Sequence, residues 1–199
     1  MGKNRLEAFS DGVLAIIITI MVLEMKVPHG GTLASLEPLI PVFLSYILSF
    51  IYLGIYWNNH HHLMHTVKMI NGNVMWSNMH LLFWLSLVPF TTGWMGENHF
   101  TTWTVVTYGF VLFMAAVAYY ILAHCLSSIH GKESVIAKAL GTDFKGRASV
   151  LLYAIGIGFS FIHPALGMLL YITVAFIWLI PDRRIERYIS EFDNKEKPL

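Results

Sequence analysis

The sequence contains few charged residues and a single cysteine, and both shortages narrow the class of protein it can encode. Charged residues make up 13% of the 199 residues, whereas soluble globular domains contain about 25%. The net charge is only +1, so the chain lacks the basic surface that collects nucleic-acid phosphates. One cysteine, Cys125, excludes an internal disulfide framework, and we expect it to be a buried apolar residue.

Several sequence patterns that accompany chemistry are also missing. The chain has no acidic run, no glycine-rich phosphate loop and no nucleophile with a base at a recognised spacing. It has neither a TVGYG-type segment for a carbonyl-lined filter nor the ladder of arginines that senses voltage. We therefore expect no enzyme activity and no bound cofactor or metal.

Apolar residues dominate instead. Hydrophobic residues make up 56% of the chain, and the mean hydropathy is +0.59. A transmembrane helix needs about 20 apolar residues, so this content suffices for roughly five or six spans. The first apolar run ends at Glu24 without a small-residue cleavage site, so we expect a retained helix rather than a signal peptide. The composition predicts an all-α integral membrane protein.

Breaks between the apolar runs predict six spans in a transmembrane domain over residues 1–181, followed by a basic tail over 182–199. The last two spans come from residues 148–180, which contain no charged group. One helix over that run would be about 50 Å long, too long for a single crossing. Pro164 divides it, and the alternative is one long kinked helix. The predicted spans cover residues 8–27, 39–60, 74–94, 101–126, 148–162 and 165–180.

The basic residues favour six spans over five. With six spans, twelve of the thirteen lysines and arginines lie on one side of the membrane, and only Lys26 lies on the other. Cytoplasmic segments carry the excess of lysine and arginine, so both termini are predicted to be cytoplasmic. The twelve residues on that side are Lys3, Arg5, Lys68, Lys132, Lys138, Lys145, Arg147, Arg183, Arg184, Arg187, Lys195 and Lys197.

Asp11 is the most informative charged residue, because it lies at the inner end of the first span and twelve uncharged residues follow it. A carboxylate there either stabilises the helix start or joins a polar network with neighbouring helices. Arg5 and Asp11 are separated by about 120° around a helix. They can pair only through bent backbone, another helix or another subunit.

The residues around Asp11 form a recognisable motif. Arg5, Phe9, Ser10 and Asp11 have the pattern R-x-x-x-F-S-D at the start of the first span. This pattern resembles the signature of the lysosomal potassium-channel family and its bacterial homologues. Further positions that resemble the family are Trp57 and His60 at the end of the second span, and Asn78, Pro89 and Phe90 in the third. The last three spans match only by size and placement.

The resemblance implies a potassium-permeable cation channel in a bacterial-type plasma membrane. It further implies a homotetramer of six-span subunits whose pore is lined by the first helix. In that family, hydrophobic side chains and a nearby hydroxyl, rather than a carbonyl filter, control conduction. The implied partners are potassium and other monovalent cations, the lipid bilayer and further copies of the chain, with no nucleic acid.

The resemblance also implies which residues line the pore, namely Ile16, Ile20 and Leu23. On a helical wheel they lie within about 60° of one another, and Asp11 lies about 140° from Ile16, facing away from the pore. We expect Asp11 to tie the helix to its scaffold. Its candidate partners are Ser10, Trp57, His60 and Asn78. Thr19 lies on the flank of the stripe, where its hydroxyl either touches a passing ion or bonds back to the Ala15 carbonyl.

Four histidines lie close together at the end of the second predicted span, and they raise the possibility of a second function. His61 and His65 are four residues apart, a spacing that can hold a metal, but no carboxylate or cysteine is near them in sequence. We interpret His60, His61, His62 and His65 as a membrane-interface helix end. The alternative function is a proton- or metal-coupled secondary transporter using Asp11 and these histidines. A transporter is less favoured, because the chain has no evident repeat and no midplane charge.

Overall fold

The computed structural model describes residues 2–67, 69–131, 134, 137 and 144–179, and their regular secondary structure is helical. The predicted tail over residues 182–199, together with Lys68, Lys132 and Lys138, lies outside the described residues. The helices in chain order are α1 (Lys3–Leu23), η1 (Leu33–Leu39), α2 (Ile40–His65), α3 (Gly72–Ser86), α4 (Val88–Glu97), α5 (Thr102–His130), α7 (Phe144–Ser160) and α8 (Pro164–Leu179).

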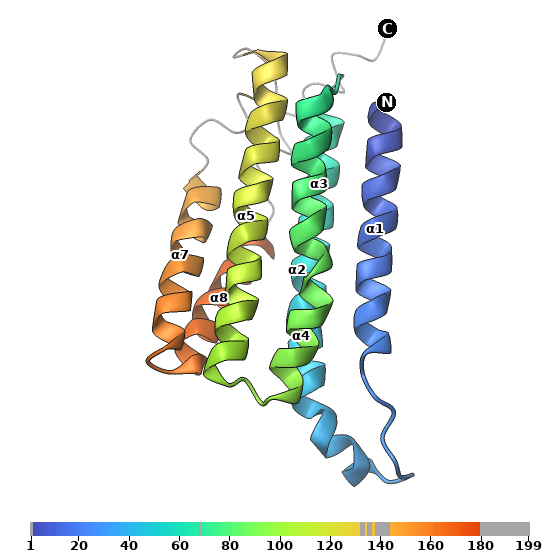
Figure 1. Cartoon of the computed structure of the whole chain (residues 1–199), viewed down its shortest axis with the longest axis vertical. Helices are drawn as coiled ribbons and strands as arrows, with labels where there is room; N and C mark the ends of the chain where they lie inside the picture. Colours follow the sequence, from blue (N-terminus) through green and yellow to red (C-terminus); the bar gives the residue numbers. More distant parts are fainter. Residues whose placement is uncertain (1, 68, 132–133, 135–136, 138–143, 180–199) are drawn as a thin grey trace, which may run out of the picture.

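The helices form an elongated bundle with α1 along one edge and the α7–α8 pair along the opposite edge (Figure 1). Helices α1, α3 and α7 begin at the end of the bundle where the N-terminus lies, and α5 ends there. The α4–α5 and α7–α8 turns lie at the other end. We call these the inner and outer ends, following the predicted cytoplasmic position of the N-terminus.

Three helical stretches are long and apolar enough to cross a membrane by length and composition: Lys3–Leu23, Leu33–His65 and Thr102–His130. Helix α8 is a shorter apolar helix. The count of six spans therefore stays a prediction. Helix α1 ends at Leu23, four residues before the predicted end of the first span at Val27, and Pro28 disfavours a helical conformation of Val27.

The segment predicted as a single third span consists of two helices, α3 and α4, which meet at Leu87. Pro89 causes the break, since it has no backbone N–H and its ring clashes with the preceding turn. The Thr92 hydroxyl donates to the Val88 carbonyl at 2.7 Å, and the Thr91 hydroxyl donates to the carbonyls of Leu87 and Val88 at 3.2 Å. The Leu87 carbonyl also accepts the Thr91 backbone N–H at 3.1 Å, so these threonine hydroxyls bond back to the first turn of α4 and pair their own polar groups within the helix.

The uncharged run over residues 148–180 is also divided, at the turn between Ser160 and Pro164. Helices α7 and α8 run in opposite directions and pack through glycines (Figure 1). A side chain added at Gly156 would place its Cβ 2.6 Å from the Tyr171 ring. Small residues let membrane helices approach closely in this way.

Tyrosine side chains fill the centre of the bundle. Tyr52, Tyr108 and Tyr171 are almost fully buried, and the Tyr52 hydroxyl donates to the Tyr171 backbone carbonyl. Between α2 and its neighbours, the Ser49 hydroxyl lies 2.6 Å from the Thr92 hydroxyl and 3.0 Å from the Tyr108 hydroxyl. These hydrogen bonds between buried groups hold α2 against α4, α5 and α8.

The close approach of α2 and α4 gives a stability test with a matched control. A Cβ at Gly96 would lie 2.6 Å from the Val42 Cα, whereas nothing lies within 4 Å of a Cβ at Gly93 on the same helix. We expect Gly96→Ala to destabilise the protein by about 1–3 kcal/mol through overpacking. Gly93→Ala should be neutral or gain up to about 1 kcal/mol from helix propensity. Thermal unfolding in detergent measures both, and equal stability of the two variants would contradict the packing described here.

Candidate functional site

Helix α1 has one buried and one exposed side. Its buried residues recur every three or four positions along the helix and face α2, α3 and α4; they are Leu6, Ser10, Leu14, Ile17 and Met21. The opposite side bears the three predicted pore residues, whose exposed fractions are 59% for Ile16, 40% for Ile20 and 78% for Leu23. An apolar face of this extent, which the described residues of the same chain leave open, is typical of a surface that meets lipid, another subunit or a pore.

A buried hydrogen-bond chain fixes which side of α1 faces the bundle. The Asn78 side-chain nitrogen donates to the Ser10 hydroxyl at 2.9 Å, and the Asn78 oxygen lies 2.8 Å from Nε2 of His60. The Ser10 hydroxyl in turn donates to the Leu6 carbonyl at 2.9 Å. Ser10 and Asn78 are fully buried and His60 is 1% exposed. Since the amide oxygen accepts, Nε2 of His60 carries the proton in this arrangement.

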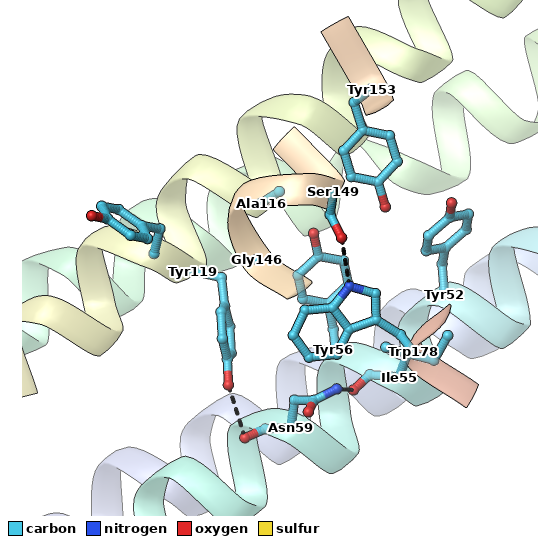
Figure 2. Close-up of a pocket in the computed structure, with 11 residues that line it drawn as sticks. Tyr52, Ile55, Tyr56, Asn59, Ala116, Tyr119, Gly146, Ser149, Tyr153 and Trp178 are labelled. Carbon is cyan, nitrogen blue, oxygen red and sulfur yellow. Dashed lines mark hydrogen bonds between the residues drawn. The ribbon is translucent and has the colours of Figure 1, made fainter. Parts of the chain in front are cut away.

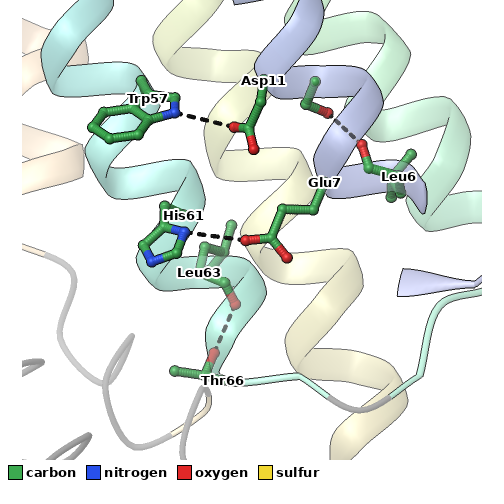
Figure 3. Close-up of polar contacts among 8 residues, drawn as sticks. Leu6, Glu7, Asp11, Trp57, His61, Leu63 and Thr66 are labelled. Atoms are coloured by element: carbon green, nitrogen blue, oxygen red, sulfur yellow. Dashed lines mark hydrogen bonds and ion pairs between the residues drawn. The ribbon is translucent and has the colours of Figure 1, made fainter. Parts of the chain in front are cut away.

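Two further contacts tie the inner end of α1 to α2, one helical turn apart (Figure 3). The Trp57 indole N–H donates to the Asp11 carboxylate at 3.1 Å. Nδ1 of His61 lies 3.1 Å from the Glu7 carboxylate. The Trp57 and His61 rings also stack, with centroids 6.4 Å apart. Both carboxylates are therefore turned toward α2 rather than toward the exposed face of α1.

The remaining motif residues, Arg5 and Phe9, lie on the exposed side of α1. On the helical wheel both fall within about 20° of Ile16, so they continue the predicted pore stripe to the inner end. Among the described residues, Lys26 forms an ion pair with Glu97, and His61 lies within ion-pair distance of Glu7 and is charged only when its ring is protonated. The described part of the chain therefore contains no Arg5–Asp11 ion pair.

Thr19 lies beside the stripe with an exposed side chain. Its hydroxyl oxygen is 3.1 Å from the Ala15 carbonyl and 2.9 Å from the Ile16 carbonyl. The single hydroxyl hydrogen is donated to these carbonyls, and the oxygen keeps lone pairs that can accept. The back-bond expected for Thr19 is thus compatible with an oxygen that also faces a passing cation.

An open groove runs along the outer half of α1, between this helix and α4. Ile16 and Ile20 line one wall, and Phe90 and Trp94 line the other. At the outer end, the Lys26 ammonium pairs with the Glu97 carboxylate at 2.9 Å, although both side chains are mostly exposed. Such exposed pairs contribute little to stability, about 0–1 kcal/mol, and the outer half of α1 is held instead by the buried side chains of Leu14, Ile17 and Met21.

Sequence reasoning missed several of these contacts. It did not pair Glu7 with His61, and it gave no role to Glu97 or to the hydroxyls of Ser49 and Thr92. The one sequence feature that could have indicated a contact of Glu7 with α2 was its position one helical turn before Asp11. The His61 and His65 rings lie 6.3 Å apart, but the described residues contain no group of three or more potential ligands arranged to hold a metal.

These features define an all-helical membrane protein whose first helix is anchored by a polar motif on one side and open on the other. The family model described as the endosomal/lysosomal potassium channel TMEM175 matches residues 5–89. With the full-length relative given below, this shows that the chain belongs to the TMEM175 family. The resemblance inferred from the R-x-x-x-F-S-D motif is confirmed.

Relatives match over very different shares of their length. A potassium channel of Chryseobacterium sp. (strain P1-3) is 56% identical over 191 residues, which make up 96% of this chain and 100% of that protein. The crystal structure of a lysosomal potassium-selective channel TMEM175 homolog from Chamaesiphon minutus has a TM-score of 0.78 at 28% identity, covering 89% of this chain and 96% of that one. The Homo sapiens endosomal/lysosomal proton channel TMEM175 is 39% identical over 75 residues, 32% of this chain and 15% of that protein. These relatives are channels rather than enzymes, which fits the expected absence of catalysis.

The anchor of α1 gives the second prediction. Asn78→Leu keeps the volume but removes the described partner of the His60 ring, whose Nδ1 also has no described partner. We expect a loss of about 1–3 kcal/mol, the cost of a buried polar group left unpaired. Trp57→Phe removes a bond at a half-exposed site and should cost less than about 1 kcal/mol. Unfolding in detergent compares the two variants, and an equal loss would show that the buried chain is not the main anchor.

Proposed function

We propose that this chain is a subunit of a potassium-permeable cation channel, a homotetramer in which the exposed face of α1 lines a central pore. The observation that carries the proposal is the position of Ile16, Ile20 and Leu23 on the face of α1 that the described residues leave uncovered. The names of the relatives support potassium as the conducted ion. The full-length Chryseobacterium relative is named a potassium channel, and the Chamaesiphon homolog is called potassium-selective.

The pore closes at a hydrophobic constriction formed by rings of isoleucine and leucine from four subunits. A narrow apolar neck loses its water, and an ion cannot enter it without a substitute for its hydration shell. Conduction then requires the rings to widen through tilt or rotation of α1. The hydrogen bonds of α1 to other helices lie in its inner half, at Ser10 and Asp11, whereas its outer half packs through apolar side chains, which can shift without breaking a hydrogen bond.

Thr19 supplies the polar group nearest to the constriction. In a tetramer, four Thr19 oxygens on the flank of the stripe would replace part of the hydration of a cation while each hydroxyl hydrogen stays bonded to its own helix backbone. Glu7 and Asp11 do not serve this purpose, because both carboxylates bond to side chains of α2.

The alternative is a proton- or metal-coupled transporter that uses Asp11 and the histidines. Transporter sites lie near the bilayer midplane, between repeats and at broken helices. Asp11 instead lies near the inner end of α1, bonded to Trp57. Potassium flux into liposomes that contain the purified protein distinguishes the two functions. A channel gives flux that follows the membrane potential, whereas saturable exchange that strictly requires a counter-ion would establish the transporter.

The constriction itself gives a prediction for the same flux measurement. Ile16→Ala and Ile16→Asn widen or hydrate the ring, so both should raise the basal potassium flux. Ile47→Ala is the matched control, since Ile47 is exposed on α2 and lines a different groove, away from α1. Its flux should equal that of the parent. If the Ile16 variants also conduct like the parent, Ile16 is not part of the gate.

A further inference from the structure

Helix α1 changes character at Gly12. Directly before this residue, Ser10 and Asp11 are hydrogen-bonded to side chains of α3 and α2. Directly after it, residues 13–23 form no side-chain hydrogen bond to another helix within the described part of the chain, and the Thr19 hydroxyl bonds back to α1 itself. Gly12 therefore lies at the junction between an anchored segment and a segment held by apolar packing.

The surroundings of Gly12 do not account for a glycine at this position. Gly12 is exposed in the interior of α1, and a Cβ added to it would meet no described atom within 4 Å. Glycine destabilises the interior of a helix relative to alanine, because its backbone has more freedom to lose on folding. The same freedom suits a residue that must absorb changes in φ and ψ when one part of a helix moves against another.

The helices on the far side of the bundle are joined by bonds that do not involve α1. Around an aromatic pocket between α2, α5, α7 and α8, the Trp178 indole N–H donates to the Ser149 hydroxyl at 2.8 Å (Figure 2). The Tyr119 hydroxyl donates to the Asn59 carbonyl at 3.2 Å. These bonds join α8 to α7 and α5 to α2. A movement of the outer part of α1 would therefore leave the scaffold behind it bonded.

The groove between α1 and α4 offers space on one flank of the pore stripe. Its volume is about 590 Å³. On a helical wheel, the α1 residues that line it all lie to one side of Ile16, within about 100° of it, whereas Thr19 lies about 60° to the other side. A turn of about 60° toward the groove would carry Ile16 and Ile20 into it and bring Thr19 to the former place of Ile16. The α1 residues that line the groove are Val13, Ile16, Ile17, Ile20 and Glu24.

We infer that Gly12 is the hinge on which the hydrophobic constriction opens. The inner part of α1 stays bonded to α2 and α3, and the outer part moves about Gly12. In the closed state Ile16 and Ile20 face the pore. In the open state they lie in the groove against α4, and the Thr19 hydroxyl faces the ion path. This inference rests on the proposed function, and it assigns to one residue the movement that conduction requires. Gly12 is thus a positioning residue, which acts through the placement of Ile16.

Potassium flux into liposomes that contain the full chain tests the hinge through Gly12→Ala. The difference in helix propensity between glycine and alanine shifts an equilibrium by up to about fivefold in each subunit. Since all subunits contribute to the constriction, we expect the flux to fall at least about fivefold. Gly54→Ala is the matched control, because it makes the same exchange on α2, where the added Cβ again meets no described atom within 4 Å. Its flux should equal that of the parent. Parent-like flux through Gly12→Ala would overturn the hinge.

The double variant Gly12→Ala/Ile16→Ala distinguishes a hinge from a narrowed pore. Because Ile16→Ala already widens the constriction, movement about Gly12 no longer limits conduction. The double variant should therefore conduct like Ile16→Ala alone. An equal drop in both backgrounds would show that the added methyl group obstructs the pore, and would overturn the hinge. Native mass spectrometry counts the subunits, and loss of the tetramer in Gly12→Ala would place the glycine at a subunit contact and overturn it as well.

Gly93→Leu tests the groove as the space that receives the isoleucines. Gly93 lines the α4 wall, and a Cβ there has no described neighbour within 4 Å, so a leucine occupies the groove without a clash. We expect the flux to fall several-fold while the melting temperature stays at the parent value. Parent-like flux would overturn the part assigned to the groove. A parent that conducts no potassium would overturn the proposed function itself, whereas parent-like flux in both glycine variants of a conducting parent would overturn only the hinge.

Discussion

The buried hydrogen-bond chain from Ser10 through Asn78 to His60 is the interaction on which the arrangement of the first helix depends. From Val13 to Leu23, α1 is apolar except for Thr19, so hydrophobic burial alone would hold this part nearly as well in any rotation. A serine and an asparagine that are fully buried can be satisfied in only one rotation. That constraint turns Ile17 and Met21 inward and leaves Ile16, Ile20 and Leu23 outside. Asp11 and Glu7 reinforce it at the surface by bonding to α2.

The same requirement to pair polar groups shapes the rest of the bundle. Threonine hydroxyls in α4 bond back to carbonyls of the preceding turn, and tyrosine and serine hydroxyls join α2 to α4, α5 and α8. Polar contacts therefore hold the inner and central parts, whereas the outer half of α1 packs through buried apolar side chains such as Ile17 and Met21. A helix fixed by hydrogen bonds at one end and by apolar packing at the other is suited to a tilt that widens a constriction at its outer half.

The helix ends and the family could be predicted from the sequence because local patterns indicate them, whereas contacts between distant residues could not. Apolar runs interrupted by Pro28 and Pro164 indicate where helices end, and the R-x-x-x-F-S-D motif identified the family. The break at Leu87 was missed, although Pro89 signalled it, because a proline is tolerated within a membrane helix when neighbours pair the freed groups. The pairing of Glu7 with His61 joins residues 54 positions apart. It depends on how α1 and α2 pack, which no local pattern contains.

The most direct test of the account is the accessibility of α1 from the pore, measured as potassium flux before and after treatment with a charged, thiol-specific reagent. In a Cys125→Ser background, the account predicts that the reagent strongly changes the flux through Leu23→Cys, whose side chain lies on the open face, and leaves Met21→Cys, on the buried face, unaffected. Modification of Leu23→Cys without any change in flux would contradict a pore lined by the exposed face of α1.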